Sequence, residues 1–215
     1  MNAVSLVVSV LALAVSATTA WLTLFRRGTV RMTQPTLIYF GSDKPRLGQQ
    51  PPPKIFLRTL LFATSKRGRV IESMHVSLAR SETNQNFNIW VHGSGSGGSG
   101  ALVRGSGVFV GETGVAADHH FLTPEDGKHF RFSAGHYRLT VYVQLVGDKA
   151  LLKLFSQQLE ITSDLAAQLE KPGAGLYFDW GPDSSRYLPH IDQRPPALPD
   201  ELLEAIAKRS SNIPQ

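Results

Sequence analysis

The most chemically loaded segment of the sequence is the tripeptide Asp118-His119-His120. Imidazole and carboxylate groups bind zinc and similar metal ions and also serve as general acids and bases. Successive side chains in a strand point to opposite faces, so His119 and His120 cannot chelate one ion together without a bulge. Residues that could complete such a site are His129, His136, Glu125 and Asp126. Without a ligand spacing such as HExxH, the simpler interpretation is one buried, hydrogen-bonded histidine beside an exposed one.

No other segment gives a catalytic set. The chain has no cysteine, which removes thiol nucleophiles and thiolate metal sites, and it has no Gly-x-Ser-x-Gly elbow. The glycine–serine run 93–100 lacks the helix and lysine of a phosphate loop, so it indicates a hairpin loop, native or engineered. Asp179 and Asp183 surround a Gly-Pro turn and favour a structural role. We predict no catalytic residue and no cofactor; a metal-dependent hydrolase using Asp118–His120 is the alternative.

Basic residues gather at the start of the chain. Residues 1–69 contain ten Lys and Arg against one acid, whereas the remainder contains twelve against sixteen. Arg26, Arg27 and Arg31 follow an apolar segment directly, where they would contact an anionic membrane surface. Basic patches also attract nucleic acid, but beside a membrane segment lipid is the simpler partner, so a nucleic-acid partner is not expected.

The apolar segment itself predicts a membrane anchor over residues 1–28. Positions 3–25 carry no charge and span about 34 Å as a helix, which is enough to cross a bilayer. The segment lacks a basic start and a clear cleavage pattern, so an uncleaved, single-pass signal-anchor is favoured over a removed signal peptide. The positive-inside rule favours a cytoplasmic over a periplasmic or extracellular location for the rest of the chain.

Small residues follow one face of the predicted helix. At about 100° per residue, they occupy a narrow stripe on which two helices can approach closely in lipid. The stripe consists of Ser5, Ser9, Ala12, Ser16, Ala20 and Thr23. It predicts self-association or a helical partner, although small residues are also common in any membrane span.

Beyond residue 28 the apolar pattern has a period of two, which is typical of strands with one buried face. About nine strands without intervening long helices predict a mainly β fold, an antiparallel β-sandwich of Ig-like or Greek-key type over residues 29–188. The expected runs are 36–40, 54–63, 73–79, 86–92, 102–110, 129–133, 136–145, 151–161 and 175–180. Tyr137 follows a glycine turn, as does the tyrosine at the corner of many such sandwiches.

Connecting segments complete the expected organisation. Residues 41–53 indicate a linker, and 189–215 indicate a proline-rich tail. Short helices are expected at 164–170, capped by Ser163, and at 201–208 within the tail. We therefore expect a membrane-anchored, non-enzymatic binding, assembly or sensor module with a protein partner. A carbohydrate- or lipid-binding module using exposed Trp90, Tyr142 or His92 is a further alternative.

Overall fold

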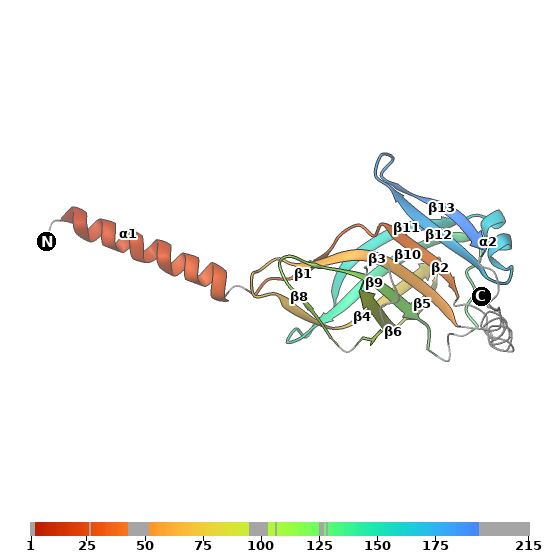
Figure 1. Cartoon of the computed structure of the whole chain (residues 1–215), viewed down its shortest axis with the longest axis horizontal. Helices are drawn as coiled ribbons and strands as arrows, with labels where there is room; N and C mark the ends of the chain where they lie inside the picture. Colours follow the sequence, from red (N-terminus) through yellow and green to blue (C-terminus); the bar gives the residue numbers. More distant parts are fainter. Residues whose placement is uncertain are drawn as a thin grey trace, which may run out of the picture.

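The computed structural model describes residues 3–25, 27–42, 52–94, 103–105, 107–124, 127 and 129–193. An apolar helix, α1 (Ala3–Ala20), extends from one end of a β-rich body and continues as a π-helical turn, η1 (Trp21–Phe25) (Figure 1). None of the residues of α1 is buried, and the segment Ala3–Thr23 is long and apolar enough to cross a membrane. Ser9 Oγ donates to the carbonyl of Ser5 at 2.9 Å, so the helix itself supplies the acceptor for this hydroxyl.

The body consists of two antiparallel sheets packed face to face, which confirms the predicted sandwich. The eight-stranded sheet has the order β13 (Arg186–Gln193), β12 (Ala174–Gly181), β2 (Leu37–Ser42), β3 (Pro53–Ala63), β9 (Val115–Leu122), β6 (Ile89–Ser94) and β7 (Val103–Arg104), with β1 (Val30–Met32) also paired to β3. The five-stranded sheet has the order β11 (Leu152–Ile161), β10 (Gly135–Leu145), β4 (Arg69–Arg80) and β5 (Thr83–Phe87), with β8 (Val108–Val110) also paired to β4. The Ig-like or Greek-key type stays a prediction.

The core lies between the two sheets, where alternate side chains of each strand meet. Strand β10 shows this most clearly, because its inward-facing residues are at most 2% exposed. They are Tyr137, Leu139, Val141, Val143 and Leu145. At the start of this strand the Tyr137 hydroxyl donates to the backbone carbonyl of Ser133 at 2.7 Å, as the glycine-turn motif predicts.

Two predicted single strands instead cross from one sheet to the other. The run 86–92 divides at Asn88, with β5 in the smaller sheet and β6 in the larger one. A single strand over 86–92 would bury Ile89 and Val91 on the same face as Phe87. Because the chain changes sheet at Asn88, Trp90 is buried instead, and Ile89 and Val91 are only partly buried. The run 102–110 crosses back in the same way between β7 and β8. These paired crossings tie the two layers together along one side.

Three further predictions need correction. Residues 129–133 form no strand, because Phe130 and Phe132 pack as a loop against the core ring of Phe87. Helix α2 (Ser163–Leu169) is capped by Thr162 and not by Ser163; the Thr162 hydroxyl accepts from the Leu165 amide. Strand β13 continues past residue 188 into the predicted tail. The helix expected at 201–208 and most of the linker 41–53 lie outside the described residues.

Candidate functional site

The structure separates the three side chains of the predicted metal site. Strand β9 lies between β3 and β6, with His119 turned into the core and Asp118 and His120 on the other face. Asp118 forms an ion pair with Arg58 at 2.8 Å. The ring of His120 packs on Phe56, with centroids 4.9 Å apart. In the part of the chain that the structure describes, no three His, Asp or Glu side chains gather as metal ligands do.

His119 is a neutral core residue. It is 1% exposed, and Trp90 Nε1 donates to its Nδ1 at 3.2 Å. Burial away from water, helped by the nearby His92 and only partly opposed by the charge of Asp118, lowers the pKa of His119 to about 4. Because Nδ1 accepts, the proton lies on Nε2, which has no hydrogen-bond partner. The interpretation of a buried, hydrogen-bonded histidine therefore fits the geometry at this position.

The residues predicted for a carbohydrate or lipid site, Trp90, Tyr142 and His92, do not form one exposed surface. Trp90 is 4% exposed, so its ring is not available for stacking on a ligand. Tyr142 lies in the other sheet and stacks on His75, with ring centroids 5.2 Å apart. His92 packs beside Trp90, at 4.9 Å between centroids.

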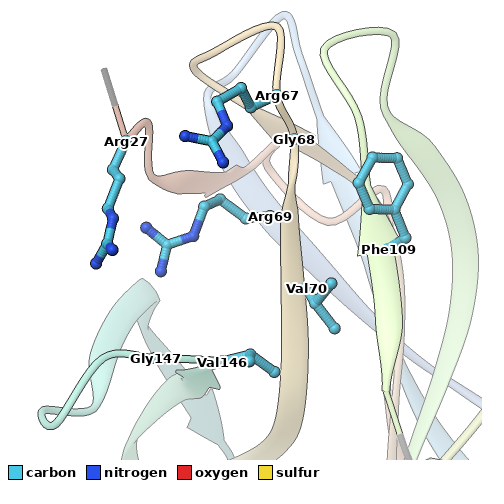
Figure 2. A pocket seen from close by; sticks show the side chains of 8 residues that line it. All are labelled: Arg27, Arg67, Gly68, Arg69, Val70, Phe109, Val146 and Gly147. Atoms are coloured by element: carbon cyan, nitrogen blue, oxygen red, sulfur yellow. The ribbon is translucent and has the colours of Figure 1, made fainter. Parts of the chain in front are cut away.

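A pocket of about 270 Å³ opens at the end of the sandwich that adjoins the N-terminal helix. We name it the proximal pocket; its lining is Arg27, Arg67, Gly68, Arg69, Val70, Phe109, Val146 and Gly147. Figure 2 shows the three arginine side chains on one side of the backbone of β4 and the Phe109 ring on the other. Arg67 and Gly68 belong to the turn that leads into β4, and Arg69 is the first residue of that strand.

The junction between helix and sandwich is fixed to the pocket. Arg69 Nη1 donates to the carbonyl of Gly28 at 2.9 Å, and its Nη2 pairs with Asp148 at 2.8 Å. The Thr64 amide donates to the carbonyl of Thr29, and the Thr29 amide donates to the Thr64 hydroxyl, so the chain is fixed to the sheet from the start of the domain. A Cβ added to Gly28 would lie 2.6 Å from the side chain of Ser65, so this contact requires glycine. The sandwich therefore begins at Gly28, directly after Arg27.

The aromatic side of the pocket rests on a glycine. Gly68 has a φ of +65°, and a Cβ added there would lie 2.5 Å from Phe109 Cζ. Phe109 thus packs on bare backbone while 61% of its surface stays exposed. Val70 and Val146 are 38% and 55% exposed nearby. Exposed apolar side chains gathered at one place mark a contact surface.

The predicted membrane-contact residues have different places. Arg27 lines the proximal pocket, Arg31 is exposed in β1 beside Phe62 of β3, and Arg26 lies outside the described residues. The predicted association stripe lies on an otherwise uncovered helix. Its residues Ser5, Ser9, Ala12, Ser16 and Ala20 stay a prediction.

Sequence reasoning placed Arg67 and Arg69 among the early basic residues but did not identify the apolar side of the pocket. The triplet Val108-Phe109-Val110 carried a usable signal, because burial of Val110 in a strand forces Phe109 outward. The contribution of Val146 and Gly147 had no local signal, since it depends on the pairing of β10 with β4.

No family model, no curated protein and no solved structure matches this chain. The function is therefore argued from the geometry of the chain itself.

Proposed function

We propose that this protein is a single-pass, membrane-anchored, non-enzymatic binding module whose sandwich sits directly on the bilayer surface. The observation that carries the proposal is the short connection between the apolar helix and the first fixed residue of the domain. The segment that is apolar enough to span a membrane ends at Thr23, and Gly28 already belongs to the sandwich.

The length of this connection limits how far the sandwich can stand from the membrane. Five residue steps reach at most about 18 Å when fully extended. The polar headgroup layer on each side of a bilayer is about 5 to 8 Å thick. If Ala3–Thr23 spans the membrane, Gly28 lies within about 18 Å of the hydrocarbon core and therefore at most about 10 to 13 Å beyond this layer.

The chemistry of that end matches the headgroup layer. Arg27, Arg67 and Arg69 supply positive charge for anionic headgroups. Phe109 and Val146 supply apolar surface for the boundary between headgroups and acyl chains. Both properties occur at the end next to α1, so the anchor and the surface contact reinforce each other (Figure 1).

The alternatives receive less support from the described geometry. A metal-dependent hydrolase needs Asp118, His119 and His120 to converge. His119 lies on the core face of β9, whereas Asp118 and His120 lie on the other face. We further propose, from the basic residues that follow α1, that the sandwich faces the cytoplasm. Pairing of α1 through its small-residue face would bring two sandwiches together on the same membrane.

The proposal is tested by measuring how deep the proximal end lies. Since the chain has no cysteine, a single introduced cysteine gives one spin-label site. The full chain carrying Phe109→Cys or Val146→Cys is reconstituted into nanodiscs that contain phosphatidylglycerol. Electron paramagnetic resonance then compares label access to oxygen, which concentrates in lipid, with access to a water-soluble nickel chelate. We expect labels at both positions to be more accessible to oxygen than to the nickel chelate.

Glu82→Cys is the matched control, because it lies in the exposed turn after β4, at the strand end opposite the pocket. Its label should be fully accessible to the nickel chelate. Labels at positions 109 and 146 that are as accessible to the chelate as the label at 82 would contradict a membrane-seated sandwich. A mature chain that begins downstream of Ala20 would contradict the anchor itself.

A further inference from the structure

We propose that the proximal pocket binds the phosphate group of an anionic membrane phospholipid. The inference rests on the proposed function and goes beyond it, since a sandwich can sit on a membrane through diffuse charge alone. A headgroup site requires in addition that defined side chains converge on one group.

The first argument is that three arginines line one pocket. Three arginines and no carboxylate occur among the described residues that line the pocket. Arg67 comes from the turn before β4, Arg69 from the first position of that strand, and Arg27 from the junction with the helix (Figure 2). A guanidinium presents planar N–H groups that match two oxygens of a phosphate, and it stays charged at any physiological pH.

The second argument is that one of these arginines is already positioned. The Arg69 side chain is 13% exposed and is held by Asp148 on one side and by the carbonyl of Gly28 on the other. A side chain held in this way loses little conformational freedom when a ligand binds. Arg27 and Arg67 line the same pocket, so the described lining residues carry positive charge and no negative charge.

The third argument is the apolar side of the same pocket. Val70, Phe109 and Val146 line the same pocket as the arginines and are all at least 38% exposed. A soluble phosphoester gains nothing from such a surface, whereas a phospholipid carries acyl chains directly below its phosphate. The pairing of charge with apolar surface therefore favours lipid over a free phosphate or a nucleic-acid backbone.

The fourth argument is size. Pockets for drug-sized ligands enclose about 300 to 1,000 Å³, and the proximal pocket at about 270 Å³ suits a headgroup. No atom lies within 4 Å of the Cβ position built on Gly147, which leaves open space at this edge of the pocket. The acyl chains would remain in the bilayer while the phosphate enters the pocket.

The test measures lipid binding to the full chain in detergent by native mass spectrometry. The probes are phosphatidylglycerol, zwitterionic phosphatidylcholine and a free fatty acid, which is anionic but has no phosphate. We expect phosphatidylglycerol to bind about 25-fold more tightly than either of the others. The double variant Arg27→Gln/Arg67→Gln should remove this preference, at about fivefold for each basic residue.

The matched control is Arg138→Gln/Arg186→Gln. It removes the same charge from exposed positions in β10 and β13, outside the pocket. We expect this control to change the preference for phosphatidylglycerol by less than twofold. If both double variants weakened phosphatidylglycerol binding equally, or if the fatty acid bound as tightly as phosphatidylglycerol, diffuse charge would explain the binding and the proposal would be overturned. Competition by soluble glycerol phosphate at the same concentration as the lipid would overturn the lipid source.

The two experiments fail independently. Spin-label access shows where the proximal end lies, and mass spectrometry in detergent shows what the pocket prefers. Deep labels without a lipid preference would leave the membrane-seated module intact and remove the headgroup site. A lipid preference with water-exposed labels would contradict the seating of the sandwich on the bilayer.

Discussion

At the scale of single residues, His119 makes core stability depend on pH. A buried imidazole that stays neutral is compatible with the apolar surroundings, but a buried imidazolium without a partner is not. Asp118, next in sequence, faces the opposite side of the strand and is engaged by Arg58. From that side the charge of Asp118 favours a protonated His119, but the effect of burial is larger and keeps the pKa of His119 low.

We expect the free energy of unfolding to be highest above pH 6.5 and to fall as the pH drops towards 4. The unfolded chain binds a proton near the ordinary pKa of 6.5, whereas folded His119 does so only near 4. The loss from this residue amounts to about 3 kcal/mol across that range. Urea titrations of the full chain in detergent, followed by tryptophan fluorescence between pH 7.5 and 4.5, measure it.

His119→Gln keeps an acceptor for Trp90 but does not titrate, so it should flatten the pH dependence over this range. The same substitution at exposed His136 serves as the control and should leave the profile unchanged. If His119→Gln retains the wild-type slope, other groups cause the acid sensitivity.

At the scale of elements, the turn that joins β3 to β4 positions the aromatic side of the pocket. Gly68→Ala should lower the free energy of unfolding by at least about 2 kcal/mol, since it combines a left-handed backbone with a clash against Phe109. Gly147→Ala is the matched comparison, because its φ of +84° is also left-handed but its Cβ meets nothing.

Only the backbone cost of about 1 kcal/mol applies to Gly147→Ala. Thermal unfolding of both variants separates the packing contribution under Phe109 from this cost. Equal destabilisation would show that Phe109 does not depend on the glycine beneath it.

The strands whose bounds the sequence predicted most closely stay within one sheet over their whole length. The alternation in β10 and the run of β3 predicted both elements closely. Asn88 was not recognisable as a crossing point, because a change of sheet depends on which neighbours are available and not on local propensity. Strand β13 was missed because Pro189 indicates a loop, yet a proline is tolerated in an edge strand.

The candidate site was predictable only in part, for the same reason. The arginines next to α1 indicated a membrane-facing region from charge alone. Their convergence with Val146 depends on a backbone hydrogen bond from Val146 to Val70, between segments far apart in the sequence. Period-two patterns reveal which side chains share a face but not which strands become neighbours.

At the scale of the whole molecule, the proposed seating predicts that the short connection and the proximal pocket restrain the sandwich independently. Ten Gly-Ser residues inserted after Phe25 should release the domain in nanodiscs of phosphatidylcholine, so that a label at Phe109→Cys becomes accessible to the nickel chelate. In nanodiscs with phosphatidylglycerol the label should stay immersed, because the pocket still holds headgroups. Loss of immersion in both membranes would show that the connection alone seats the domain.

The outer edge of the larger sheet has a consequence for the membrane-anchored module that we propose. Strand β13 forms this edge and carries Pro189 together with the charged side chains of Arg186 and Asp192. Proline has no N–H to offer an incoming strand, and charges on an edge oppose stacking of one sheet on the next. Crowded copies diffusing in two dimensions can therefore collide at this edge without polymerising into fibrils.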